Sequence, residues 1–178
     1  MTLTIDLVPH MDAGDRKQWQ RDQDERPLSD LGHTQARALV KAFVRKPIDA
    51  LYSSPALRCR QTLEPIAKKR GLAIVVLPEL RETDGFAGPE EWISGQYGAA
   101  YAAGRALVAV EQIRTAHDEG HVIVCSHGDI IPSLVACLAG AHELESVPRI
   151  ERRGQWYRVR FTKRGIALEL AEAAAFPL

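Results

Sequence analysis

The stretch HVIVCSHGD, residues 121–129, constrains the fold more than any other segment of the chain. Its core, residues 122–125, is an uninterrupted apolar run without the polar alternation of a strand that has one wet face. Such a run is typical of a central strand in a parallel sheet, where helices cover both faces. The run leads directly to His127 and Gly128. We therefore expect an α/β sheet that presents a histidine at its carboxyl edge.

Helical and strand patterns alternate along the rest of the chain, with short turns between them. The expected strands are residues 4–8, 49–53, 72–77 and 121–125, followed by a terminal hairpin of 156–161 and 166–170. The expected helices start at a Ser29 cap and stop before Pro47, run from Ser54-Pro55 through Lys69, cover about 97 to 118, and extend from Ile130 to Leu138. Residues 83–98 contain four glycines and a proline, which predicts an irregular excursion. One domain, residues 1–178, accounts for the pattern, with a mixed, mostly parallel sheet flanked by helices on both faces in three layers.

Charge and cysteine content exclude several functional classes. Lys plus Arg and Asp plus Glu are 23 each, so no overall field favours nucleic acid or a membrane surface. No basic and apolar leader opens the chain, and no apolar stretch approaches the roughly 18 residues of a membrane span. Three cysteines without a CxxC pair do not form a disulfide framework. We expect a protein of the reducing cytoplasm.

Arginines concentrate in two segments, residues 15–26 and 149–161. Clusters of this kind are usually solvated surface, and we interpret both segments in that way until a site is located.

Four residues of complementary chemistry come together at the expected carboxyl edge, where ligands of open α/β sheets bind. His10 ends the first strand and His127 ends the fourth, while Arg58 lies in the helix after the second strand and Glu82 follows the third. Each of these residues alone is more often structural. Two imidazoles, a guanidinium and a carboxylate together suit one chemistry, which is in-line transfer of a phosphoryl group to imidazole.

Five segments in the same order resemble the histidine phosphatase superfamily, also called the phosphoglycerate mutase-like family. They are LVPHMDAGD (7–15), RPLSDLGHTQARAL (26–39), LYSSPALRCRQTLEPIA (51–67), LPELRE (77–82) and VIVCSHGDII (122–131). The compact length and the loop before RPLS are similar to the small phosphohistidine phosphatase branch and to the phosphatase domain attached to some mycobacterial Nudix hydrolases.

The resemblance implies a role for each of the four residues. His10 would be the nucleophile that becomes phosphohistidine, with one ring nitrogen attacking while the other donates to a carbonyl. Arg58 would hold two phosphoryl oxygens, and a protonated His127 would donate to the same oxygens. Glu82 would protonate the leaving oxygen and later deprotonate water, a role that requires a carboxyl pKa raised by partial burial.

The same resemblance implies the remaining features of the site. Ser126 and Gly128 would shape the turn, and Gly128 would allow the backbone to approach the ligand closely. The walls of the pocket would be residues 15–26, with Arg16 and Arg26 as binding candidates, and residues 83–98. No metal or organic cofactor is implied. The substrate would be a small phosphorylated molecule or a phosphoprotein, and the chain is short for a mutase that encloses a phosphosugar.

Pro9 departs from the family pattern, which has arginine directly before the nucleophile. Proline removes a backbone donor and the guanidinium that would share the phosphate with Arg58. If these donors act in the transition state, the rate penalty is on the order of 10²–10³. Another arginine could replace the missing one, the site could retain only anion binding, the chain could be a variant of an active parent, or Pro9 could be without consequence. The candidates for replacement are Arg16, Arg21, Arg26 and Arg81.

Two other functions remain open at this level. The first is a catalytically inactive module that binds phosphate or a phosphoprotein on the same scaffold, with Pro9 as the inactivating change. The second is a metal-dependent phosphoesterase, because His10-Met11-Asp12 and His127-Gly128-Asp129 are two H-x-D triplets at adjacent strand ends. The second pattern is weak, since such triplets recur by chance and Arg58 would place a positive charge beside the metal.

Overall fold

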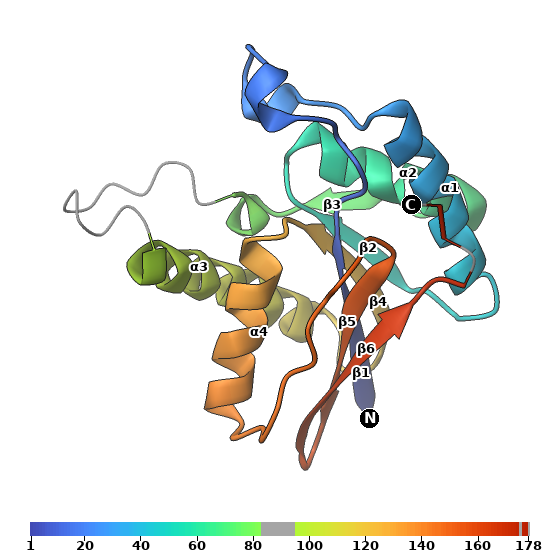
Figure 1. Cartoon of the computed structure of the whole chain (residues 1–178). Coiled ribbons are helices and arrows are strands. Elements are labelled where there is room, and N and C mark those ends of the chain that lie inside the picture. The colour runs from blue at the N-terminus through green and yellow to red at the C-terminus, as the bar shows by residue number, and fades with distance from the viewer. Residues whose placement is uncertain (83–94, 175, 178) are drawn as a thin grey trace.

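A six-stranded mixed sheet forms the middle layer of the structure, a computed structural model that describes residues 1–82, 95–174 and 176–177 (Figure 1). Its strands are β1 (Thr2–Pro9), β2 (Ala50–Ser53), β3 (Ile74–Val76), β4 (Gly120–Ser126), β5 (Gln155–Thr162) and β6 (Gly165–Glu172). They are arranged in the order β3-β2-β4-β1-β5-β6. The first four in this order are parallel, and the hairpin of β5 and β6 adds to β1 in antiparallel orientation. The prediction of a mixed, mostly parallel sheet is confirmed.

Helices cover both faces of this sheet, as predicted (Figure 1). They are α1 (Asp30–Phe43), α2 (Leu57–Arg70), α3 (Gly95–Ala116) and α4 (Ile130–Ala141). One apolar core joins α3 and α4 to the sheet, and a second core joins α1 and α2 to the other face. Short 3₁₀ turns occur at Arg16–Gln18 (η1), Gln23–Glu25 (η2) and Pro78–Leu80 (η3). None of the helices within the described ranges is long and apolar enough to span a bilayer.

The central pair of strands, β1 and β4, positions the two histidines. Val8 pairs with Cys125 and Pro9 with Ser126, so both strands end at the same level of the sheet. Side chains of β1 alternate between the two cores, with Leu7 on the α3/α4 side and Val8 on the α1/α2 side. The residues that follow these strands therefore meet at one edge, as the apolar run 122–125 predicted.

The start of α1 supports the loop that follows His10. The Ser29 side chain accepts a hydrogen bond from Gly32 N–H at 3.0 Å, so the predicted helix cap is confirmed. Gly32 is required at its position, because a Cβ there would clash with the carbonyl oxygen of Asp12. The helix thus packs directly against the backbone of the loop that follows His10.

The start of α2 was predicted wrongly. Ser54 does not cap this helix, which begins at Leu57 and has Ala56 at its N-cap without a side-chain hydrogen bond. Ser54 remains attached to the sheet, because its N–H donates to Cys125 O at 2.9 Å and its hydroxyl is 2.8 Å from His127. Helix α3, on the other face of the sheet, begins at Gly95, which lies inside the segment 83–98 that was predicted to be irregular. The rest of the prediction cannot be compared, because residues 83–94 lie outside the described part of the chain.

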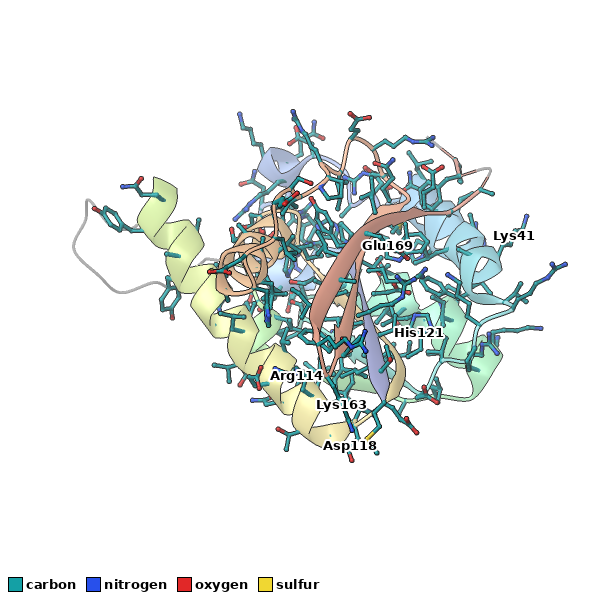
Figure 2. All side chains as sticks on the ribbon, turned by 90° about the horizontal axis from the view of Figure 1, so that it is seen from below. Lys41, Arg114, Asp118, His121, Lys163 and Glu169 are labelled. Atoms are coloured by element: carbon teal, nitrogen blue, oxygen red, sulfur yellow. The ribbon has the colours of Figure 1, made fainter. Side chains whose placement is uncertain are left out.

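A buried ionic network ties β1 to β4, β5 and β6 on the α1/α2 face. Asp6 is fully buried, with His121 Nε2 2.6 Å and Arg158 Nε 2.7 Å from its carboxylate oxygens. Arg158 and Arg160 both contact Glu169 on β6. Figure 2, seen from below relative to Figure 1, labels His121 and Glu169. Burial alone would raise the pKa of Asp6, but the hydrogen bonds and charge of His121 and Arg158 hold it below its usual value.

We predict that Asp6→Ala destabilises the fold by about 3–5 kcal/mol, because it leaves Arg158 buried without its main partner. A carboxyl with a depressed folded pKa contributes stability above its unfolded pKa of about 3.9, and this contribution is lost as the pH falls. The difference between the native chain and the variant should therefore be largest near neutral pH and should shrink in acid. Urea denaturation between pH 3 and pH 7 measures it, and equal stability of the two proteins at pH 7 would contradict the prediction.

Candidate active site

His10 directly follows β1, and contacts of its backbone and of one ring nitrogen fix its position. Its backbone N–H donates to Ser126 O at 2.9 Å, and its Nδ1 is 2.7 Å from Met11 O. A carbonyl only accepts hydrogen bonds, so Nδ1 carries the proton and Nε2 keeps its lone pair. Burial lowers the pKa of His10 below the usual value, so the ring is neutral at physiological pH.

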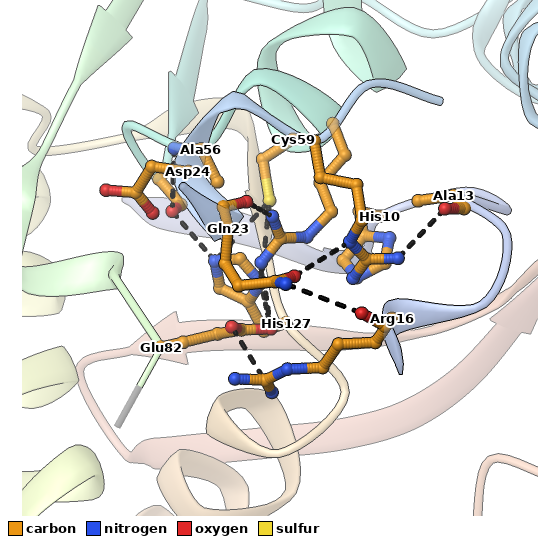
Figure 3. A network of polar contacts seen from close by, with 12 residues as sticks. His10, Ala13, Arg16, Gln23, Asp24, Ala56, Cys59, Glu82 and His127 are labelled. Carbon is orange, nitrogen blue, oxygen red and sulfur yellow. Dashed lines mark hydrogen bonds and ion pairs between the residues drawn. The ribbon is translucent and has the colours of Figure 1, made fainter. Parts of the chain in front are cut away.

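His127 faces His10 from the end of β4, with the ring centroids 5.5 Å apart and the planes at 71° (Figure 3). Its Nε2 is 2.8 Å from Ser54 Oγ and its Nδ1 is 3.2 Å from Glu82 Oε1. Burial alone would lower the pKa of His127, but the Cys59 sulfur and the Glu82 carboxylate outweigh burial and raise it to about 9. The ring is therefore protonated near neutral pH and donates through both nitrogens.

Arg58, in the first turn of α2, places a fully buried guanidinium between these groups. Nη2 is 2.8 Å from Glu82 Oε1, and Nη1 donates to Gln23 O at 2.5 Å. Nη2 of Arg58 also lies 3.3 Å from Nδ1 of His127. Both nitrogens are donors when His127 is protonated, so they do not bond to each other but share Oε1 of Glu82 as their acceptor. Among the described residues, Arg58 Nε has no hydrogen-bond partner. A bound anion would supply the missing acceptor.

Glu82 completes the group from the segment after η3, and its carboxylate lies where an anion would be expected. Oε1 contacts Arg58 and His127, and Oε2 is 3.6 Å from Arg16 Nη1. Burial alone would raise the pKa of Glu82, but His127, Arg58 and Arg16 hold it well below its usual range. The expected raised pKa is therefore wrong for this anion-free site, because the carboxylate itself is the counterion of these cations.

The predicted binding arginines differ in what they do. Arg16 reaches the site through Glu82, with Nη1 3.6 Å from Oε2, and its side chain is 51% exposed. Arg26 is buried and donates to Ala13 O at 2.9 Å and to Gly14 O at 3.2 Å, which holds the loop after His10. Of the other arginines considered as substitutes for the missing one, Arg21 pairs with Glu25 and Arg81 pairs with Asp24.

Ser126 and Gly128 both lie at the turn between β4 and α4. The Ser126 hydroxyl donates to Leu80 O at 2.8 Å and so ties this turn to η3, next to Glu82. Gly128 lines a cavity beside His10, and a Cβ at this position would meet no atom within 4 Å. The protein itself therefore does not require a glycine there, although a ligand could.

Sequence reasoning missed four contributors to the site. Ser54 and Cys59 contact His127, Gln23 supplies the carbonyl to Arg58, and Arg153 donates to the carbonyl of His10 at 3.1 Å. Ser54 and Cys59 belong to the motif around Arg58, so their positions were available signals. Gln23 belongs to the segment 15–26, which the family resemblance implied as a wall of the pocket, whereas nothing local in the sequence indicates that Arg153 reaches this edge.

The group His10, Glu82 and His127 could in principle hold a metal ion, since one ligand atom from each lies within 4.8 Å of the others. Two features oppose it. Arg58 places a guanidinium 2.8 Å from the carboxylate, and His127 is protonated near neutral pH. The predicted H-x-D pairing is also not the one formed at His10, because Asp12 accepts hydrogen bonds from Ser29 Oγ and Gly14 N.

Comparison with known proteins agrees with this geometry. Residues 11–173 match the model of the histidine phosphatase superfamily (branch 1). The match begins one residue after His10, so the assignment of His10 depends on the contacts described above. The chain is 31% identical over 134 residues to an 8-oxo-(d)GTP phosphatase of Mycolicibacterium smegmatis, which covers 75% of this chain and 37% of the relative. It spans well under half of the length of the curated relatives that it matches.

Solved structures share the fold over nearly the whole chain. Bacillus stearothermophilus YhfR superposes with a TM-score of 0.77 at 18% identity, covering 97% of this chain and 98% of the other. A mycobacterial glucosyl-3-phosphoglycerate phosphatase superposes with a TM-score of 0.72 at 17% identity, covering 98% and 100%. A phosphoglycerate mutase from Bacillus anthracis gives 0.72 at 15% identity over 96% and 92%. The family match and the fold together establish that the chain belongs to the histidine phosphatase superfamily.

Proposed function

We propose that this protein is a phosphatase that hydrolyses a phosphomonoester or a phosphoramidate through a phosphohistidine on His10. The observation that carries the proposal is the fully buried guanidinium of Arg58, whose Nε has no partner among the described residues, beside the two imidazoles of His10 and His127, whose ring centroids lie 5.5 Å apart. Glu82 already pairs with this cation, but the buried Nε still needs an acceptor, and the flanking imidazoles suit a nucleophile on one side and a donor on the other.

In the first step, Nε2 of His10 attacks phosphorus while the bond to the leaving oxygen breaks. An incoming phosphoryl group takes the donors of Arg58 and His127, which displaces the Glu82 carboxylate from them. This removes the contacts that hold the pKa of Glu82 low and places the carboxyl beside an anion. Glu82 then binds a proton and gives it to the leaving oxygen, so that a neutral alcohol departs.

In the second step, water attacks the phosphorus of phosphohistidine. The Glu82 carboxylate accepts a proton from that water, the N–P bond breaks, and His10 returns to its neutral form with inorganic phosphate released. Glu82 ends this step protonated, which balances the proton that it gave in the first. His127 and Arg58 compensate the charge on the equatorial oxygens in both steps. These residues can perform the reaction without a metal or organic cofactor.

The proposed substrate class is based on the anion site and on one of the relatives. A small phosphorylated molecule or a phosphoprotein fits the anion site, and the 8-oxo-(d)GTP phosphatase relative supports a nucleotide as one such molecule. Balanced charge gives no reason to expect nucleic acid or membrane as a partner. The three free cysteines support the cytoplasm as its setting.

A module that only binds phosphate or a phosphoprotein is the second candidate, and Pro9 is the observation that favours it. Turnover of p-nitrophenyl phosphate at high protein concentration, beside a His10→Ala control, separates the two. We expect release above the control, and an acid-labile, alkali-stable phosphoprotein after quenching with ³²P-labelled substrate. Release no greater than that of the control, together with measurable phosphate binding, would support the binding module.

We predict that kcat/KM depends on pH in a bell-shaped profile with a broad plateau. The nucleophile must be neutral, so activity rises with pH through the lowered pKa of His10, below 6.5. The donor must be protonated, so activity falls as the pH rises through about 9, the raised pKa of His127. His127→Gln should remove the alkaline limb while keeping the acid limb. An alkaline limb that persists unchanged in this variant would refute the assignment.

The role of Glu82 predicts that Glu82→Gln affects substrates according to their leaving groups. Hydrolysis of an alkyl phosphate, whose leaving oxygen needs a proton, should fall about 10²–10⁴-fold, the usual range for loss of a general acid. Hydrolysis of p-nitrophenyl phosphate should fall much less, because nitrophenolate leaves without a proton. The ratio of the two values of kcat is the measurement, and equal losses on both substrates would exclude Glu82 as the acid.

A further inference from the structure

Arg153 lies beside the nucleophile, although it is 143 residues away in the sequence. It belongs to the arginine-rich segment 149–161, which we had interpreted as solvated surface. Its Nη1 donates to His10 O at 3.1 Å, and its Nη2 is 3.5 Å from Asp12 Oδ1. One planar guanidinium therefore bridges the backbone of the nucleophile and a side chain two residues later.

Asp12, the second anchor of this bridge, is itself held firmly. Its carboxylate accepts a hydrogen bond from Ser29 Oγ at 2.5 Å and another from Gly14 N at 3.1 Å. The hydrogen bond from Ser29 lowers the pKa of Asp12 most, and the hydrogen bond from Gly14 and the charge of Arg153 lower it further. Burial alone would raise this pKa, but the net result lies below the usual value. The carboxylate is thus charged, and it connects Arg153 to the N-terminus of α1.

The carbonyl of His10 has an open space beside it. A cavity of about 350 Å³ is lined by Pro9, His10, Met11, Gly128, Pro132 and residues 150–155. The backbone N–H of His10 is fixed by Ser126 O, and its Nδ1 is fixed by Met11 O. Pro9 offers neither an N–H nor a charged side chain on this side. Within the described part of the chain, Arg153 is the side chain that holds the carbonyl.

We propose that Arg153 is a positioning residue for His10. By fixing the carbonyl of His10 against Asp12, it holds the peptide whose rotation would swing the imidazole away from the line of attack. The guanidinium missing at position 9 is thus partly replaced by one that comes from the other end of the chain and acts on the backbone of the nucleophile. This inference rests on the proposed phosphatase function.

Arg152 provides a matched control for this proposal. It has the same charge, lines the same cavity and is similarly exposed, at 50% against 44% for Arg153. Its guanidinium pairs with Glu172 at 2.9 Å, and no contact with His10 is found among the described residues. A general effect of removing a positive charge from this loop would be the same for both arginines, whereas positioning of His10 would be specific to Arg153.

The kinetic test compares Arg153→Ala, Arg153→Lys and Arg152→Ala with the native chain on p-nitrophenyl phosphate. Misplacement of a reacting group by about 1 Å costs on the order of 10²-fold, so we expect Arg153→Ala to lower kcat about 10- to 100-fold with KM changed less than about twofold. Arg153→Lys should recover little, because an ammonium group cannot bridge two acceptors in the same plane. Arg152→Ala should stay within about twofold of the native kcat, and added guanidinium should partly rescue Arg153→Ala. Equal effects of the two alanine variants would overturn the proposal.

A second measurement does not depend on turnover. ¹⁵N chemical shifts of the His10 ring report which nitrogen is protonated and the pKa of the ring. We expect the native chain and Arg152→Ala to show the proton on Nδ1, and Arg153→Ala to show a mixture of tautomers with the fold intact by circular dichroism. Unchanged His10 shifts in Arg153→Ala would overturn the positioning role. If the native chain shows no turnover above His10→Ala, the proposed phosphatase function fails, and the shifts alone decide the role of Arg153.

Discussion

The fully buried guanidinium of Arg58 is the constraint around which the rest of the site is arranged. A charge removed from water is tolerated only when it is paired and hydrogen-bonded, so the chain must bring acceptors to this position. It does so with a backbone carbonyl from η2 and a carboxylate from the segment after η3. Both segments lie outside α2, so the buried charge ties three parts of the chain together. The same charge disfavours a metal ion and favours a phosphoryl group.

Much of the fold could be predicted from local patterns. The apolar run 122–125 indicated the central strand, and the alternation of strands and helices indicated a layered α/β domain with both faces covered. The two histidines could be brought together because parallel neighbours end at one edge, as the pairing of Pro9 with Ser126 bears out. The order of the strands could not be predicted, since periodicity says which face is buried and not which strand lies beside which.

The site was harder to predict, because its details depend on contacts between distant segments. Ser54 has the signature of a helix cap, but bonding to the sheet and to His127 outweighs that local preference. The pKa of Glu82 is lowered where the chemistry suggested a raised value, because three cations share its carboxylate in the absence of a ligand. The arginine-rich segment before β5 looks like surface, and only the tertiary fold shows that one of its members, Arg153, contacts the backbone of His10.

The position of Glu82 between the cations has a consequence for affinity. If the proposed function holds, a phosphate ester replaces the Glu82 carboxylate, which already neutralises Arg58 and His127. The free energy of binding is then only the difference between these two sets of interactions, and the carboxylate can return to the cations after cleavage. We therefore expect inorganic phosphate to be held weakly. A deeply buried cation without a counterion would bind oxyanions very tightly. With Glu82 as its counterion, Arg58 can exchange one anion for another.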